Sequence, residues 1–507
     1  MDKEFVLGLD IGTTSAKAVL FQRDGQVVAE QEQCYPTYHE KIDWAEQNPD
    51  EIERACRFVI QALIKKSKIP VSRWICGGIS AAMHSLICVN EEIEALSPAM
   101  IWADRRSMSQ AYQLTISHSH LYDKTGTPLH PMSPLAKLMW LKENKLETFQ
   151  QTAYFISIKE YIIYKWFGEK VIDYSIASAT GLFNIHTFCW EEESLKLAGI
   201  SSHQLFTLVD PTFVLHNFRP EVAKNIMLPA GFRFVLGASD GPLANLGIGA
   251  IHTNDVAITI GTSGAIRRFT STPDIESQKQ TFCYAFTKDL WIVGGPTNNG
   301  GNVLEWMKAF FDHKYTHEQL LVDASKSSIG ANGLLCLPYL HGERAPLWDA
   351  NAKGTFIGIN PTHTRHDFVR SALEGVIFSL YHVADSMLPS DEQTITSLYA
   401  SGGFARSPLW LQIVADVFSK EVIVPKSHQS SAWGAAWLAL YALDEVSSLQ
   451  HIKPHIPIEQ TIYPNKKNHK AYEQLFSIYQ SLAVTLRYTF DDITKFQQLR
   501  EEVDEDD

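Results

Sequence analysis

The fold is decided by the stretch Gly8-Leu9-Asp10-Ile11-Gly12-Thr13-Thr14-Ser15-Ala16-Lys17, close to the start of a chain of 507 residues. Residues 5–11 are apolar apart from Asp10 and predict a strand, and residues 17–21 predict a second strand. A glycine and hydroxyl residues lie between the two. Backbone N–H groups and side-chain hydroxyls in such a turn can converge on phosphate oxygens. The stretch therefore predicts a phosphate-binding loop that joins two strands.

A related loop returns half a chain later as Ile258-Thr259-Ile260-Gly261-Thr262-Ser263-Gly264. Only the first copy carries a carboxylate, Asp10, and a cation, Lys17. We expect the first loop to manage Mg²⁺ and the transferred phosphate, and the second to hold the remaining phosphates. No Gly-Lys-Ser/Thr ending of the Walker type occurs in the chain. The pair of loops predicts phosphoryl transfer from a nucleotide held between two related domains.

Other elements also recur in the two halves. Residues 74–80 predict a strand with a glycine pair, and residues 398–403 resemble it. Asn48 and Pro49 predict a helix start, with Glu51 closing a capping box. Alternation of strands and helices predicts an α/β fold in which mixed sheets are flanked by helices. We expect three segments, namely an N-terminal domain 1–247, a C-terminal domain 248–490 and a frayed acidic tail 491–507.

Composition limits the class of partner. The chain is 45% hydrophobic and 20% charged, as in an ordinary globular enzyme, and its formal net charge is −13. This charge argues against nucleic acid and anionic membranes, which attract basic surfaces, so we expect a small-molecule substrate. The seven cysteines are scattered and the apolar runs are too short to span a membrane, which predicts a reducing cytoplasm. Whether the chain forms a homodimer stays open.

Longer motifs carry a resemblance to a known family. Two phosphate loops are typical of the superfold of sugar kinases, actin and heat-shock ATPases. Residues 132–144, Met-Ser-Pro-Leu-Ala-Lys-Leu-Met-Trp-Leu-Lys-Glu-Asn, resemble the first signature of the FGGY carbohydrate kinases, and residues 354–374 resemble the second. Within that family the chain is most similar to the gluconate-phosphorylating branch, through stretches such as Ala82-Met83-His84-Ser85, Trp102-Ala103-Asp104 and Gly237-Ala238-Ser239-Asp240-Gly241.

The resemblance implies two ribonuclease-H-like domains with an active-site cleft between them, and ATP and Mg²⁺ as cofactors. By the same resemblance Asp240 is the general base, although on sequence alone an aspartate before a glycine is more often a turn residue. Asp10 is the expected metal-ordering carboxylate, and Lys17 is expected to face the transferred phosphoryl group. These three residues form the predicted catalytic set.

The predicted nucleotide contacts come from both loops and from the family's nucleotide-side positions. Turn or cap duty is the structural alternative for the nucleotide-side positions Gly301, Gly402, Gly403 and Ser407. The predicted contacts are Gly12, Thr13, Thr14, Ser15, Gly261, Thr262, Ser263, Gly301, Gly402, Gly403 and Ser407.

The predicted sugar contacts follow from the resemblance, and several have structural alternatives: His84 as a histidine satisfied by backbone, Met132 as a core residue. They are Met83, His84, Asp104, Arg106, Met132, Lys159 and Asp240. Gluconate carries a carboxylate, so a cation should meet it. The candidates, which sequence cannot rank, are Arg106, Lys159, Arg344 and His84.

The function expected from this resemblance is ATP-dependent phosphorylation of a sugar or sugar acid, D-gluconate to 6-phosphogluconate. One alternative is a kinase for a ketopentose or polyol such as xylulose. A second, from another class, is an actin-like or chaperone-like ATPase that acts on protein. Almost all residues belong to the two nucleotide-fold halves, which leaves little chain for a peptide-binding domain.

Overall fold

The structure is a computed structural model, and it describes residues 3–275, 278, 280–311, 314–387, 395–426 and 429–505. The chain forms two compact units. The first comprises Met1–His252, Phe269–Ile292 and Gln429–Pro457, and the second comprises Thr253–Arg268, Val293–His428 and Ile458–Asp507. The units thus differ from the single division after residue 247 that we expected, because two later segments of the chain belong to the first unit.

The first unit is built on a six-stranded mixed sheet with the order β13-β14-β5-β1-β2-β3. Strands β1, β2 and β3 form an antiparallel meander, whereas β1, β5 and β14 run parallel. The predicted loop therefore does join two strands. The strands are β1 Phe5–Ile11, β2 Ser15–Gln22, β3 Val27–Cys34, β5 Trp74–Ala81, β13 Val214–Leu215 and β14 Phe234–Ser239.

Helices and short strands complete this unit. The helices are α1 Pro49–Ser67, α2 Met108–Ser117, α3 Leu121–Thr125, α4 Pro134–Asn144, α5 Leu146–Gln151, α6 Ile158–Phe167, α7 Tyr174–Ser178, α8 Glu192–Ala198, α9 Pro220–Ile226, α10 Asp240–Gly247 and α15 Ser430–Ala442. The short strands are β4 Glu46–Gln47, β6 Ile87–Val89, β7 Ala99–Met100, β8 Tyr154–Ile156, β9 Val171–Asp173, β10 Phe183–Asn184, β11 Cys189–Trp190, β12 Thr207–Val209 and β17 Phe282–Thr287.

Helix α1 shows how local sequence sets an element. The Asn48 side chain accepts hydrogen bonds from the backbone N–H groups of Asp50 (2.9 Å) and Glu51 (3.3 Å), which confirms the predicted start. The expected capping box is wrong, because the Glu51 carboxylate accepts a hydrogen bond from the Tyr38 hydroxyl (3.2 Å) instead. The helix packs on β2 and β3.

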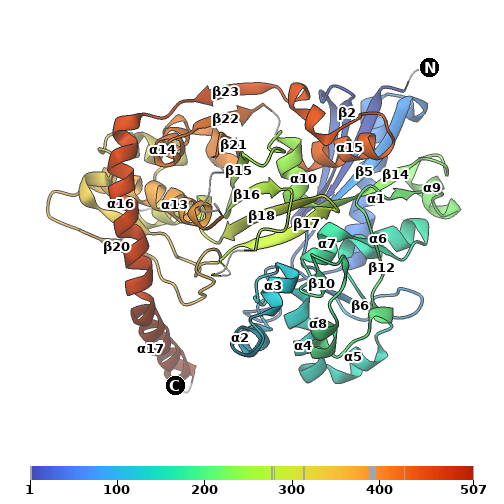
Figure 1. Cartoon of the computed structure of the whole chain (residues 1–507), viewed down its shortest axis with the longest axis horizontal. Coiled ribbons are helices and arrows are strands. Elements are labelled where there is room, and N and C mark those ends of the chain that lie inside the picture. The colour runs from blue at the N-terminus through green and yellow to red at the C-terminus, as the bar shows by residue number, and fades with distance from the viewer. Residues whose placement is uncertain are drawn as a thin grey trace. The chain divides into compact units, whose positions relative to one another are not determined.

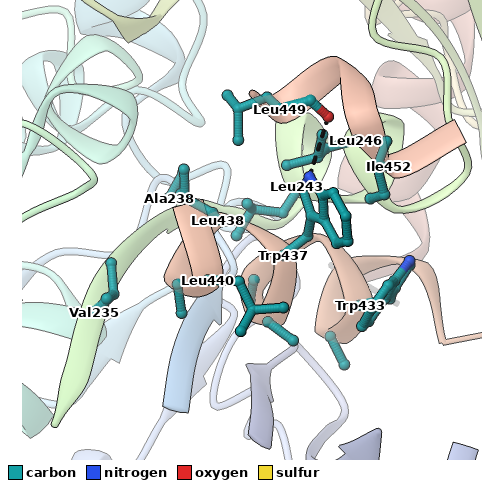
Figure 2. Packing of buried hydrophobic residues seen from close by; sticks show 14 of the residues in the cluster. Val235, Ala238, Leu243, Leu246, Trp433, Trp437, Leu438, Leu440, Leu449 and Ile452 are labelled. Atoms are coloured by element: carbon teal, nitrogen blue, oxygen red, sulfur yellow. Dashed lines mark hydrogen bonds between the residues drawn. The ribbon is translucent and has the colours of Figure 1, made fainter. Parts of the chain in front are cut away.

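Helix α15 comes from the C-terminal part of the chain, yet it packs on β1, β5 and α10 of the first unit (Figure 1). Glycine makes this approach possible, since a Cβ on Gly78 would lie 1.9 Å from the carbonyl oxygen of Ala435. Figure 2 shows the resulting core, in which the Trp437 indole N–H donates to the Leu449 carbonyl (3.1 Å). Close backbone packing and buried tryptophans therefore hold residues 429–457 in the first unit.

The second unit repeats the arrangement of the first. Strand β15 pairs antiparallel with β16 and parallel with β21, as β1 does with β2 and β5, and β22 and β23 extend the sheet. Its strands are β15 Asp255–Ile260, β16 Gly264–Thr270, β18 Leu290–Thr297, β19 Leu335–Leu337, β20 Thr355–Ile357, β21 Ser397–Ser401, β22 Glu421–Pro425 and β23 Ile458–Ile462, of which β16 and β18 run across the division between the units.

The helices of this unit are α11 Gly301–Phe310, α12 His317–Ser325, α13 Arg365–Met387, α14 Pro408–Phe418, α16 Lys466–Thr485 and α17 Arg487–Glu505. The acidic tail, expected to be frayed, continues as helix α17 to Glu505; its last two residues lie outside the described part. Glutamate, glutamine, lysine and arginine are good helix formers, which accounts for the difference. Among the described residues no helix is long and apolar enough to cross a membrane.

Candidate active site

The first phosphate loop is a tight turn between β1 and β2. The Gly12 N–H donates to the carbonyl of Ser15 (3.0 Å), which closes the turn. Thr14 is exposed and Thr13 is half-buried, so both can present hydroxyl groups to a ligand. Ser15 is buried, and its hydroxyl donates to Oε1 of Glu32 (2.6 Å). The phosphate contact predicted for Ser15 would require that hydroxyl to change its partner.

Three side chains outside the predicted site hold this loop. Gln47 donates from Nε2 to the carbonyl of Thr13 (2.6 Å), and Trp102 donates from Nε1 to the Thr13 hydroxyl (3.0 Å). The Tyr35 hydroxyl donates to the carbonyl of Gly12. Trp102 lies in a quoted family stretch and could have been found, whereas Tyr35 and Gln47 carry no sequence signal because only the fold brings them to the loop.

Asp10 belongs to a row of paired residues that crosses the sheet. Its backbone is paired with Ser80 on β5 and with Lys17 on β2, and directly paired side chains project from the same face. The Ser80 hydroxyl donates to Oδ1 of Asp10 (2.7 Å). Lys17 forms an ion pair with Glu32 (3.4 Å) on β3, so its ammonium group has a partner before any phosphate binds.

The Asp10 carboxyl has a perturbed pKa. Burial raises the pKa of Asp10 to about 6, the Ser80 hydrogen bond opposes this shift, and the negative charge of Asp240 adds to it. Strand β14 ends at Ser239, and Asp240 is the first residue of α10 rather than a turn residue. Because β1 and β14 run in the same direction, both carboxylates lie at the same edge of the sheet.

These residues suit a magnesium ion. Mg²⁺ prefers oxygen ligands and is commonly held through one or two carboxylates. Burial is the main cause of the raised pKa of Asp10 and the Asp240 charge is a smaller one, and a bound cation would favour the ionised form of both carboxylates. A second candidate cluster, His118, His120 and Glu193, contains no predicted site residue. It is accounted for by ion pairs, since Glu193 also binds Lys124 (3.0 Å).

Met83 and His84 follow β5. Met83 is half-buried and lines a small cavity, of about 10 Å³, together with Gly12, Thr13 and Trp102. The His84 ring is buried, and its Nδ1 lies 2.7 Å from the carbonyl oxygen of Ala179. The structure therefore brings Met83 beside the first phosphate loop, and it gives His84 the backbone contact named above as its structural alternative. Met132, by contrast, is 2% exposed and belongs to the core.

Arg106 is neutralised inside the protein. Its guanidinium group binds Asp104 (2.6 Å) and Glu46 (2.6 Å) and lies 3.7 Å from the ring centroid of Trp44. Asp104 is fully buried and also accepts from the backbone N–H of Ala45 (2.8 Å). This network fixes the segment after Trp102 and neutralises Arg106 internally, which argues against Arg106 as the partner of a substrate carboxylate.

Lys159 also forms an ion pair inside the protein. Its Nζ lies 2.7 Å from Oδ2 of Asp173, and the two side chains are 2% and 1% exposed. Oδ1 of Asp173 meanwhile accepts from the backbone N–H of Ile176 (3.0 Å) as the N-cap of α7. Separating such a pair would leave Asp173 buried and uncompensated. The placement of Lys159 therefore argues against the predicted substrate contact.

The second phosphate loop lies in the second unit. The N–H of Gly261 donates to the carbonyl of Ser263 (2.9 Å), so this turn is one residue shorter than the first loop, and Thr262 is exposed. The loop abuts the start of α11, where the Gly301 N–H donates to the carbonyl of Gly261 (2.7 Å). A Cβ on Gly301 would lie 2.7 Å from that oxygen, so this glycine permits the close contact between helix and loop.

Residues 402–407 follow β21, the neighbour of β15. Gly402 has φ of +98°, and a Cβ there would lie 2.4 Å from the Ile260 carbonyl, so this position needs glycine for the fold itself. Gly403 is exposed, and a Cβ there would meet nothing within 4 Å. Ser407 caps α14 by accepting from the Trp410 N–H (3.2 Å). Of these three residues, Gly403 is therefore the one with open space beside it for a ligand.

Arg344 also belongs to the second unit. It is 9% exposed, and its Nη2 donates to the carbonyl of Thr297 (2.9 Å).

The whole chain is similar in sequence and in structure to known proteins. The chain is 40% identical over 506 residues to a gluconokinase of Bacillus subtilis (strain 168), covering 97% of this chain and 98% of that protein. It is 30% identical to a xylulose kinase of the same organism, covering 94% and 96%. The crystal structure of gluconate kinase from Lactobacillus acidophilus matches with a TM-score of 0.93 at 35% identity, covering 96% and 99%. This match confirms the predicted fold class.

Family models match both halves. The N-terminal domain of the FGGY family of carbohydrate kinases matches residues 5–247, and the C-terminal domain matches residues 256–443. The two matches contain the first and the second phosphate loop, respectively. The chain therefore belongs to the FGGY family of carbohydrate kinases.

Proposed function

We propose that this carbohydrate kinase transfers the γ-phosphoryl group of ATP to the 6-hydroxyl of D-gluconate, with Asp240 as general base. The observation that carries the substrate is the 40% identity to a gluconokinase over 97% of the chain. The observation that carries the base is the place of Asp240 at the end of β14 and the start of α10, at the same edge of the sheet as Asp10. ATP is the phosphoryl donor in this family.

Asp240 has two properties that a base requires. It is half-buried, so a substrate hydroxyl can reach it, and it begins α10, where the positive end of the helix dipole favours its ionised form. The carboxylate accepts the proton of the 6-hydroxyl as that oxygen attacks the γ-phosphorus. The bond between the γ-phosphorus and the oxygen that bridges to the β-phosphorus breaks, and ADP leaves. A positioned base of this kind contributes about 10² to 10⁴ in rate.

The first loop orients the phosphates in this proposal. Thr13 is held at its carbonyl by Gln47 and at its hydroxyl by Trp102, so its position is set before ligands bind. Asp10 holds Mg²⁺, which neutralises phosphate charge when bound. In the second unit Thr262 and Gly403 are exposed and supply the remaining nucleotide contacts.

Fewer residues are candidates for binding the gluconate carboxylate than the sequence predicted. Arg106 and Lys159 each neutralise an internal carboxylate, which leaves His84 and Arg344 as the candidates. Glucitol, which lacks the carboxylate, should therefore be a poor acceptor. The expected loss in transition-state binding is about 2 to 5 kcal/mol if a desolvated charged group is left unpaired.

A coupled assay of ADP release tests the substrate with gluconate, xylulose, ribulose, glycerol, glucose and glucitol at equal concentration. Gluconate should give the highest kcat/KM. The second candidate substrate is xylulose, because a xylulose kinase is 30% identical over 94% of the chain. A higher kcat/KM for xylulose or glycerol than for gluconate would overturn the substrate and leave the family intact.

A further inference from the structure

Lys137, in helix α4, is a buried ammonium group bound to backbone carbonyls. Its side chain is fully shielded from solvent. Nζ donates to the carbonyls of His84 (2.7 Å), Ile101 (2.8 Å) and Met100 (3.3 Å). An ammonium group has three donors, so these three carbonyls use all of them. The residue lies in the first family signature, but neither the base nor the phosphate loops account for it.

The three carbonyls belong to two segments that pair antiparallel, and further along the Leu96 N–H also donates to the Cys88 carbonyl (2.8 Å). Leu86 and Met100 exchange both backbone hydrogen bonds at 3.0 Å. On the His84 side of this pair the backbone pairing stops, because His84 has φ of +68° and turns the chain out of the extended conformation. Lys137 binds the carbonyls just beyond this last pair, those of His84 and Ile101, and so continues the connection where backbone pairing ends.

Both segments border the candidate site. Residues 82, 83 and 85 of the first segment and 99, 101 and 102 of the second line the cavity that also includes Gly12 and Thr13. The second segment carries Trp102, whose indole N–H binds the Thr13 hydroxyl (3.0 Å). Lys137 thus connects the Met83–His84 segment to Trp102, and Trp102 connects both to the first phosphate loop.

We propose that Lys137 is a positioning residue for the sugar. Its ammonium group sets the distance between the Met83–His84 segment and the Ile101–Trp102 segment, and this distance determines how well the sugar is bound and aligned with the phosphates. The proposal rests on the proposed function in one respect, namely that Met83 and His84 border the sugar. Lys137 acts only through these two segments, since its own side chain is buried and all of its donors are used.

The protonation state of Lys137 makes the proposal testable through the pH dependence of the gluconate KM. Burial lowers the pKa of Lys137 to about 7, the Asp104 carboxylate opposes this, and the Arg106 guanidinium adds to it. The ammonium group binds the backbone carbonyl of His84, whereas the His84 ring lies against the Ala179 carbonyl (2.7 Å). Above a pH of about 7, the neutral amine keeps two N–H donors for three carbonyls. The KM for gluconate should therefore rise with pH in the wild type and stay flat in Lys137→Arg, whose charge persists.

The test compares Lys137→Met, which removes the donors at similar length, with Lys137→Arg, which keeps them. Lys142→Met on the exposed face of α4 is the matched control. Steady-state kinetics should show the gluconate KM raised about 10- to 100-fold in Lys137→Met, the range that lost bonds to a charged group imply, with the KM for ATP little changed. Hydrogen exchange should accelerate in residues 82–86 and 99–104. Lys137→Arg should recover most of the loss.

Two results would overturn the proposal. One is a folded Lys137→Met protein with an unchanged gluconate KM; the other is an equal rise in both KM values with faster exchange throughout the first unit, which indicates general structural support. If Lys137→Met does not fold, the pH profiles decide, and identical profiles for wild type and Lys137→Arg count against positioning. A wild type that does not phosphorylate gluconate contradicts the proposed function instead, and the variants are then compared on the sugar it does use.

Discussion

The Ser80 hydroxyl donates a hydrogen bond of 2.7 Å to Oδ1 of Asp10, and the two residues are directly paired on neighbouring parallel strands. This bond favours the charged form of Asp10. Burial and the charge of Asp240 favour the neutral form, and together they leave the pKa of Asp10 at about 6. Ser80 therefore helps to keep the Asp10 carboxylate ionised at neutral pH, although no family motif marks this serine.

Replacing Ser80 by alanine should move the acid limb of kcat/KM to higher pH. Loss of a hydrogen bond to the charged form raises the pKa of Asp10, so the carboxylate becomes protonated earlier as pH falls. We expect a shift of about one pH unit from a wild-type midpoint near 6. Ser325→Ala, an exposed serine at the end of α12, is the control and should leave the limb in place. An unmoved limb in Ser80→Ala would show that Asp10 does not control it.

Asp10→Asn should stabilise the protein while removing activity. The folded-state pKa of about 6 lies above the ordinary aspartate value of 3.8, so the folded form binds more protons and loses stability as pH rises through this window. The variant lacks that penalty. At pH of about 7 its free energy of unfolding should exceed that of the wild type by about 1–3 kcal/mol, and at pH of about 3.5 the difference should nearly vanish. Urea unfolding of the apo proteins at both pH values measures this, and equal differences at both would contradict it.

Asp240→Asn should keep the fold and nucleotide affinity but lose at least about 10² in turnover. The change is nearly isosteric, and it removes the group that accepts the proton. Single-turnover kinetics with gluconate measures the chemical step, and calorimetry checks ATP binding. Asp24→Asn, an exposed aspartate in the turn between β2 and β3, is the matched control. Full activity in Asp240→Asn would exclude this residue as the base.

Gly402 and Gly403 should respond differently to substitution. Gly403→Val should fold normally, because a Cβ there meets nothing within 4 Å, and should weaken ATP binding by filling the space a nucleotide needs. Gly402→Ala should lower the thermal midpoint, because φ of +98° and the Ile260 carbonyl at 2.4 Å both oppose a side chain. Calorimetric titration with ATP and thermal unfolding separate the two effects. Normal ATP affinity in Gly403→Val would place the nucleotide elsewhere.

Lys159→Met should unfold more easily instead of losing substrate affinity selectively. The change leaves Asp173 buried without its partner, at a cost of about 3–5 kcal/mol. Lys159→Met combined with Asp173→Asn should recover part of that loss, because the neutral amide no longer needs an ammonium partner. Denaturant midpoints measure the stability, and gluconate KM measures the alternative role. A stable Lys159→Met protein with a strongly raised gluconate KM would restore Lys159 as the substrate's cation.

The elements that local sequence controls were predicted well. Strand β1, the turn at Gly12 and strand β2 are contiguous, and the Asn48 cap acts on the next three residues, so composition over a short window is enough. The capping box failed at Glu51 because Tyr38, from a different segment, binds the same carboxylate. Short-range patterns cannot anticipate such a competitor.

By itself the sequence determined the two phosphate loops, the strand and helix classes around them, and the family. Only the tertiary structure decided which charged groups remain available to a substrate: Arg106 is neutralised by Glu46, 60 residues away in the chain, and Lys159 by Asp173. The tertiary structure also places α15 in the first unit, and it buries the Lys137 ammonium group against three backbone carbonyls. Helix α15 is held there by apolar packing, and one physical reason is common to the three charged residues. Burial makes a charged or polar group bind whichever partner the fold brings near, and that partner is set by long-range packing, which no local pattern records.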